Sequence, residues 1–167
     1  MKKLNNTLLV LMLFQFALLG QELEPDAFDF WVGEWEASWD EGDGKKGFGT
    51  NKIEKILDGK VIRENFEISE GKSKGFKGTS ISVFNPQKKE WHQAWADNNG
   101  GYYDFYGIVE SDKRIFQTHV FDLPDDVKFI QRMIFYNITK NSMTWDWESS
   151  KDGGDTWNLN WRIYYTK

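Results

Sequence analysis

The polar residues best placed to do chemistry in this sequence alternate with aromatic and aliphatic ones. Between positions 91 and 97, every second residue belongs to one series, which consists of Trp91, Gln93, Trp95 and Asp97. Glu64 stands in a similar series between Ile62 and Ile68. If these segments are strands, each series shares one face, because successive side chains of a strand point to opposite sides. A carboxyl group on an apolar face needs a partner or a proton, since desolvation disfavours its charged form.

Polar groups among aromatic rings are the usual lining of a small-molecule pocket, and a β-barrel can hold one small ligand in its interior. We therefore predict an interior binding site for a small, partly apolar molecule. Its residues are chosen by the face they share and by their polarity, and they are Glu64, Ser80, Trp91, Gln93, Trp95, Tyr106, Trp145 and Trp147.

Two other interpretations of the same residues stay open. In the first, the protein is an enzyme: Glu64 in an apolar setting acts as general acid or base, and Gln93 or Asp97 orients a substrate. The sequence shows no evident set of nucleophile, base and orienting residue, so binding is favoured over catalysis. In the second, the interior is filled by its own aromatic side chains, and Glu64 pairs with Arg132.

Cofactors and metals are not expected. His92 and His119 are the two histidines of the chain, and one axial histidine would suffice to hold haem. A lone histidine on a strand is typically a surface or core residue, however, and His92 alternates with the tryptophan series, so it should point outward. The acidic loops 40–43 and 152–155 lack the ligand spacing of a calcium-binding loop.

Composition narrows the class of protein further. The 167 residues suffice for one domain, and 17% of them are aromatic. There is no cysteine, which excludes disulfides and thiolate sites. Lys and Arg total 21 against 26 Asp and Glu, a formal charge of −5. Nucleic acid is not an expected partner, because its phosphate backbone is bound by clustered cations.

The first twenty residues have the features of a secretory signal peptide. Lys2 and Lys3 precede an apolar stretch over 8–19, and Gly20 supplies a small residue for cleavage. We expect a signal peptide at 1–20, a leader at 21–27 and a barrel domain at 28–167, in a periplasmic or extracellular protein. After cleavage no stable membrane insertion is expected; the alternative is an uncleaved anchor. The oligomeric state is left open.

Turn signals recur about every ten residues after Trp31, with a period of two between them, which is typical of an all-β protein. Asp58-Gly59 predicts a two-residue hairpin turn, and Pro25 begins a short helical turn at 25–31. Consecutive hairpins closing on themselves leave no exposed edge, so we favour an antiparallel up-and-down barrel over a sandwich. The ten predicted strands are 34–39, 50–57, 60–68, 77–84, 91–97, 102–109, 114–121, 127–137, 143–149 and 156–165.

Several of these segments resemble the DUF1579 family of lipocalin-like proteins. The opening FDFWVGEW at 28–35, the block WHQAWADN at 91–98 and the block WESSKDGGDTW at 147–157 carry the likeness, which extends from Phe28 to Tyr165. The resemblance implies a calycin-type β-barrel with an internal cavity, and no established activity. Arg162 departs from the acidic residue expected at its position.

Gly33 and Trp35 suggest how one end of the barrel is closed. Gly33 permits a tight turn into the first strand, and Trp35 would then plug the barrel end. An arginine over the Trp35 ring would add a cation–π contact, and Arg162 or Arg132 could supply it.

Overall fold

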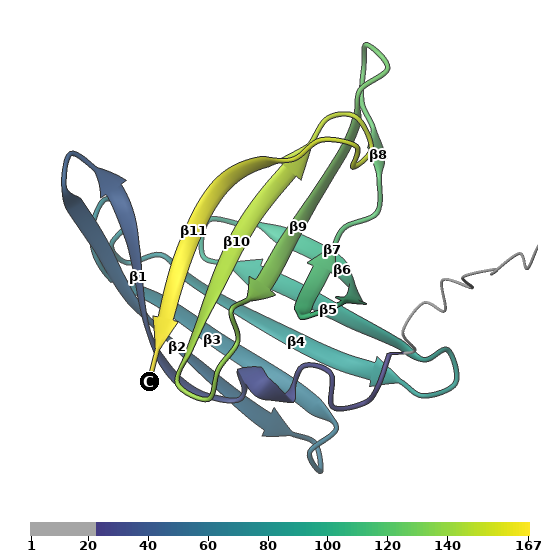
Figure 1. Ribbon diagram of the computed structural model, residues 1–167, viewed down its shortest axis with the longest axis horizontal. Helices are drawn as coiled ribbons and strands as arrows, with labels where there is room; N and C mark the ends of the chain where they lie inside the picture. The colour runs from purple at the N-terminus through teal and green to yellow at the C-terminus, as the bar shows by residue number, and fades with distance from the viewer. Residues whose placement is uncertain (1–22) are drawn as a thin grey trace, which may run out of the picture.

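Antiparallel pairing of consecutive strands dominates the fold (Figure 1). The computed structural model describes residues 23–167. Its elements are the 3-10 helix η1 (Asp29–Trp31) and the strands β1 (Gly33–Gly42), β2 (Lys45–Ile56), β3 (Val61–Glu70), β4 (Lys77–Asn85), β5 (Glu90–Asp97), β6 (Tyr102–Glu110), β7 (Lys113–Gln117), β8 (Phe121–Asp122), β9 (Lys128–Tyr136), β10 (Ser142–Ser150) and β11 (Asn158–Thr166). The all-β prediction is therefore confirmed, including its short N-terminal helical turn.

The sheet closes on itself. Strands β1 to β7 pair in chain order, β7 pairs with β9, β9 with β10, β10 with β11, and β11 returns to β1. Ten strands thus form a closed barrel, and β8 is an additional short strand that pairs with β9. Closure gives each barrel strand a partner on both sides, which removes the unpaired edges of an open sheet.

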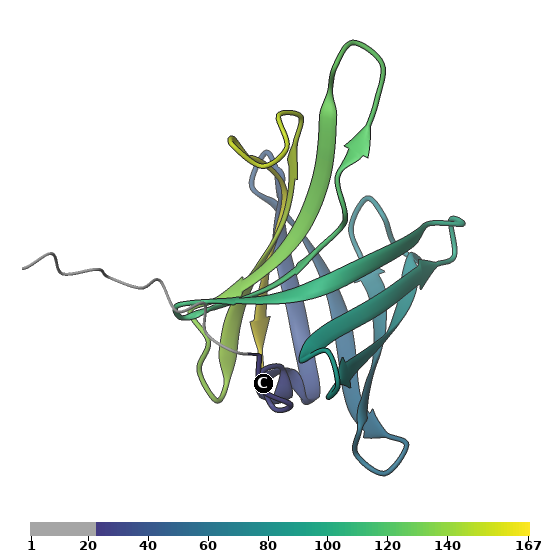
Figure 2. The same cartoon turned by 90° about the vertical axis from the view of Figure 1, so that its right-hand side faces the viewer.

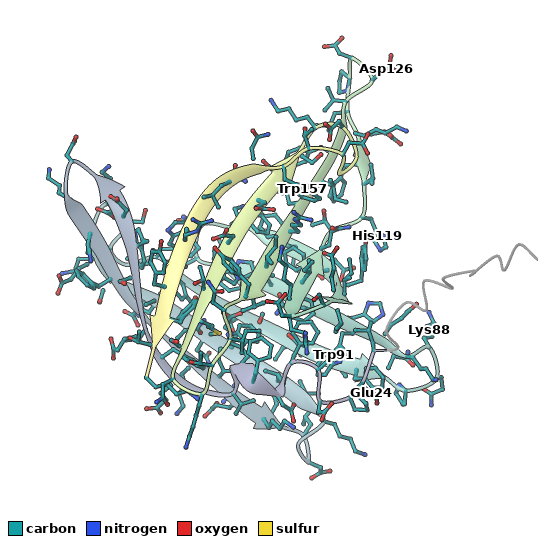
Figure 3. All side chains as sticks on the ribbon, viewed as in Figure 1. Glu24, Lys88, Trp91, His119, Asp126 and Trp157 are labelled. Carbon is teal, nitrogen blue, oxygen red and sulfur yellow. The ribbon has the colours of Figure 1, made fainter. Side chains whose placement is uncertain are left out.

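The predicted strand at 114–121 is interrupted. Strand β7 ends at Gln117, and the chain then leaves the barrel wall before pairing again in β8. Thr118 is held by its backbone N–H, which donates to the carbonyl oxygen of Gln131 at 2.9 Å. The hairpin between β8 and β9 projects beyond the other loops, with Asp126 at its tip (Figures 2 and 3).

The turn at Asp58-Gly59 is longer than predicted. Ile56 pairs with Val61, so four residues form the loop instead of two. Leu57, Asp58 and Gly59 all have positive φ, and Gly59 N–H donates to the Ile56 carbonyl oxygen at 3.1 Å.

An aromatic cluster fills the end of the barrel at which η1 lies. Phe28 is fully buried, and its ring stacks on Phe116 at 4.2 Å and meets the edge of Trp91 at 5.2 Å. Trp91 Nε1 donates to the Glu24 carbonyl oxygen at 3.0 Å, which fastens the segment before η1 to strand β5 (Figure 3). This end is closed by packing of the N-terminal segment into the barrel.

Trp35 also helps to close this end, but the cation over its ring is Lys167, not the predicted Arg162 or Arg132. Its indole N–H donates to the Trp31 carbonyl oxygen at 2.8 Å, and the ammonium of Lys167 lies 4.2 Å from the ring centroid. Arg162 instead pairs with Asp146 on the neighbouring strand, at 2.6 Å. The lysine reaches Trp35 because β11 and β1 are adjacent at the closure of the sheet.

Alternation predicts the interior face correctly for most strands. The series that contain Glu64, Ser80, Gln93 and Met143 all point inward. Strand β11 departs from regular alternation, because Trp147 pairs with Trp161 while Glu148 pairs with Leu159. This register shift sends the Leu159 side chain outward, where it is half exposed.

The expected signal peptide at 1–20 and the beginning of the leader at 21–27 lie outside the described residues. Within residues 23–167, no helix is long and apolar enough to cross a membrane.

Replacement of Phe28 by alanine should destabilise the protein by about 3–5 kcal/mol, the usual cost of deleting a buried aromatic ring from a packed core. Urea unfolding followed by tryptophan fluorescence measures this change. The control is Phe121→Ala, whose ring is half exposed and should cost much less. Equal unfolding midpoints for the two variants would contradict the closed, packed end.

Candidate functional site

The half of the barrel away from η1 contains a cavity of about 300 Å³. Aromatic side chains form most of its wall, and two carboxyl groups also contribute to it. The lining residues are Glu64, Phe66, Phe76, Trp95, Asp97, Tyr103, Phe105, Met133, Trp145, Trp147, Trp161, Ile163 and Tyr165.

A wider hollow of about 660 Å³ adjoins this cavity at the loop end of the barrel. The two spaces share Phe76 and Trp161 as wall residues. The hollow is bounded by exposed residues of the β3–β4 and β5–β6 connections, at 72–75 and 98–99. The cavity therefore lies next to the surface at the end of the barrel opposite the aromatic plug.

Glu64 is held at the cavity by two neighbouring strands. Asn51 Nδ2 on β2 donates to Glu64 Oε1 at 2.7 Å, and the Ser80 hydroxyl on β4 donates to Oε2 at 2.7 Å. Both partners are buried. Ser80 lies directly across from Glu64 in the sheet, and Asn51 lies diagonal to it. One hydrogen bond to each carboxyl oxygen fixes the orientation of the group without neutralising its charge.

Burial dominates the electrostatics of this carboxyl group. Glu64 is 5% exposed, and desolvation raises its pKa to about 7 against the lowering effect of the bonds from Ser80 and Asn51. Tyr165 also lines the cavity, with its hydroxyl 3.4 Å from Asn51 Nδ2. Burial, together with the nearby Glu64 charge, raises the pKa of Tyr165.

The second carboxyl group, Asp97, is in a different environment at the end of β5. Burial acts to raise its pKa, but the backbone N–H groups of Gly101 and Asn99 and the Trp95 indole N–H hold the pKa below its ordinary value. These donors lie 2.9–3.2 Å from the carboxyl oxygens. Asp97 is therefore ionised at neutral pH, whereas the pKa of Glu64 is about 7.

Four indoles form much of the aromatic wall. The rings of Trp145 and Trp147 are stacked at 6.4 Å, and Trp161 meets Trp145 almost perpendicularly at 5.8 Å. Trp95 lies flat against β4 beside Gly78, where a Cβ atom would overlap its ring carbons. The absence of a side chain at Gly78 is what lets this indole lie back against the wall.

The structure brings four of the eight predicted site residues to the cavity wall, namely Glu64, Trp95, Trp145 and Trp147. Ser80 is beneath the wall, as a hydrogen-bond donor to Glu64. Trp91 belongs to the aromatic plug instead. Gln93 is buried but does not line the cavity, and its Nε2 donates to the Ser82 hydroxyl at 2.9 Å.

Tyr106 is the one predicted residue on the outer face of the barrel. Its neighbour Phe105 is buried and lines the cavity, so alternation along β6 places Tyr106 on the other side. There its hydroxyl accepts a hydrogen bond from Gln117 Nε2 at 2.7 Å, and its ring stacks on His119 at 5.1 Å. His92 is also outside, within 3.3 Å of Glu90.

Arg132 is not the partner of Glu64 that a filled barrel would need. It forms an ion pair with Glu148 at 2.7 Å and lies 3.7 Å from the centroid of the Trp157 ring. Alternation accounts for this placement, because Arg132 and Glu148 are paired across β9 and β10 on the outer face. Among residues 23–167, no three His, Asp or Glu side chains are grouped so as to hold a metal ion.

Sequence reasoning missed several residues of the site. Asn51 occupies the inward series of β2 with Gly49 and Ile53, and this spacing could have revealed it. Asp104 is two residues from Tyr106 on β6 and is charged, so its presence could have indicated that Tyr106 faces the outside of the barrel. Phe76 carried no such signal, because it belongs to a loop. Asp97 was expected at the site only in the enzyme interpretation, and the other lining residues not predicted are Phe66, Tyr103, Phe105, Met133, Trp161, Ile163 and Tyr165.

Comparison of this chain with protein-family models and with curated proteins finds no match.

Glu64→Gln should change how stability depends on pH. The folded protein holds the Glu64 proton up to about pH 7, whereas the unfolded chain releases it near 4.5. The wild-type protein should therefore lose stability as pH rises through this window, by about 3 kcal/mol in all, and then level off. Glutamine carries no charge and can keep both contacts, because its oxygen accepts from Asn51 and its amide N–H donates to the Ser80 hydroxyl, so the variant should lack this loss.

Urea unfolding of both proteins between pH 5 and pH 8 measures the effect. The control is Glu67→Gln, an exposed position on the same strand that pairs with Lys77 at 3.0 Å. This control should follow the wild-type curve. A constant difference in unfolding free energy between wild type and Glu64→Gln across the pH range would show that Glu64 is not desolvated.

Proposed function

We propose that this protein is a lipocalin-like binding protein that holds a small, partly apolar molecule inside its barrel. The observation that carries the proposal is the 300 Å³ cavity, which reaches from the loop end of the barrel to Glu64. This volume is at the lower end of the range of ligand pockets. The ligand is therefore small.

The division of the interior supports binding over a purely structural barrel. The half near η1 is filled by Phe28, Trp91 and their neighbours. The other half keeps space between aromatic rings, with a few polar groups among them. An apolar pocket with few, well-placed polar groups is the usual form of a small-molecule site.

We also infer membership of the DUF1579 family and export to the periplasm or the extracellular space. The sequence blocks at 28–35, 91–98 and 147–157 support the family, together with the barrel fold. The lysines and the apolar stretch before Gly20 support export.

Acid–base catalysis is a second candidate, favoured by one observation. The pKa of Glu64 near 7 is the value at which a carboxyl group can both accept and donate a proton at neutral pH. Turnover of a bound molecule that disappears in Glu64→Gln, with the fold retained, would establish this activity.

Titration with 2-phenylethanol, a neutral aromatic probe of suitable size, tests the binding function. We expect saturable heat in calorimetry and saturable quenching of tryptophan fluorescence. Gly78→Ala should weaken binding at least tenfold, because the added methyl group displaces the Trp95 indole from its place on β4.

Ile81→Ala is the matched control, since Ile81 is on the same strand and partly exposed on the outer face. It should bind as the wild type does. Non-saturable signals with every probe tested, or equal affinity in wild type and Gly78→Ala, would refute binding in this cavity.

A further inference from the structure

We propose that the molecule bound in this cavity is an organic cation, an amine or ammonium compound whose charged nitrogen lies against the Glu64 carboxylate and whose apolar part fills the space between the indoles. This inference rests on the proposed binding function and specifies its ligand class.

The charges of the cavity wall select the sign of the ligand. Glu64 and Asp97 line the cavity, and none of its lining residues is Lys, Arg or His. An anionic ligand would face two carboxyl groups without any compensating cation, in a place where low polarity strengthens repulsion. The partners of the buried Glu64 carboxylate, Asn51 and Ser80, are both neutral. A cationic ligand would instead provide the positive charge that this carboxylate lacks.

The aromatic wall suits the same charge. Indole and phenol rings carry negative potential on their faces and attract a cation within about 6 Å of the ring centroid. Trp95, Trp145, Trp147, Trp161 and Tyr103 all contribute to the wall around the carboxyl groups. Rings set perpendicular to one another, as Trp145 and Trp161 are, surround a bound group from more than one side. Aromatic enclosures of this kind are the usual sites for quaternary ammonium groups.

The hydrogen-bonding capacity of Glu64 leaves room for an ammonium donor. A carboxylate offers about four lone-pair positions, and the protein uses one on each oxygen, through Asn51 and Ser80. An ammonium group carries donors and no acceptor, so it matches the remaining positions. The bonds from Asn51 and Ser80 hold the carboxylate in place before the ligand arrives, which lowers the cost of ordering the site.

Positive charge near the cavity is confined to its rim. Lys72 and Lys74 border the wider hollow and are exposed. Lys72 is engaged there, because its ammonium donates to the Glu41 carbonyl oxygen at 2.6 Å. Exposed charges at the rim are screened by water and salt, so they do not offset the buried carboxyl groups.

Binding of a cation should be linked to a proton. The titratable groups facing the cavity are Glu64 on β3, Asp97 on β5, Tyr103 on β6 and Tyr165 on β11. Asp97 is already ionised at neutral pH, so the linkage falls to Glu64, whose pKa is about 7. At pH 6 most of the free protein carries the Glu64 proton, and a bound ammonium must displace it. Affinity for an amine should therefore be about tenfold weaker at pH 6 than at pH 8.

Three probes of equal size separate charge from shape: 2-phenylethylamine, 2-phenylethanol and phenylacetate, which are cationic, neutral and anionic at pH 8. We expect calorimetry on the wild-type protein to show at least tenfold tighter binding of the amine than of the alcohol, and no measurable binding of the carboxylate. This series needs no variant, so it stands even if a substitution impairs folding.

Glu64→Gln should weaken binding of the amine at least tenfold and remove its pH dependence, so that the amine no longer binds more tightly than the alcohol. Glu67→Gln, the exposed control on the same strand, should bind all three probes as the wild type does. Equal affinities for amine and alcohol, or an amine affinity unaffected by Glu64→Gln, would overturn the cation proposal while binding itself stood. Failure of all three probes to bind would instead refute the binding function.

Discussion

The desolvation of the Glu64 carboxyl group is the constraint on which the binding site in this barrel depends. Glu64 is enclosed by aromatic rings, and its two oxygens are bonded to Asn51 and Ser80 on the flanking strands. Closure of the sheet places this carboxyl group in the interior, where it is 5% exposed, because an open sheet would leave the face of β3 solvated. The raised pKa of Glu64, the neutral polar residues around it and the ligand class that we propose all follow from this enclosure.

The two halves of the barrel use the same residue types for different purposes. Near η1, Phe28 and Trp91 pack tightly, and Gly107 allows both side chains to approach the wall of β6. Toward the loop end, Gly78 lets Trp95 lie flat against β4 in a comparable way, but no segment within residues 23–167 fills the space beside it. The N-terminal segment therefore fills one half, and the other half remains a cavity.

Period-two alternation was sufficient to predict the barrel, its ten strands and the inward direction of Glu64, Trp95, Trp145 and Trp147, because a closed sheet enforces one dry face. It failed where the backbone departs from regular pairing. The register shift opposite Trp147 turns Leu159 outward, and the chain leaves the wall after Gln117. Contacts across the closure, such as Lys167 on Trp35, depend on which strands meet there, and local sequence does not carry that information.

The most direct test of this account is the titration of the Glu64 carboxyl carbon by NMR, with Glu64→Gln used to assign its signal. The account predicts a midpoint near pH 7, well above that of the exposed glutamates. A midpoint near 4.5, the ordinary value for glutamate, would show that water reaches this carboxyl group and that the proposed cation site does not exist in this form.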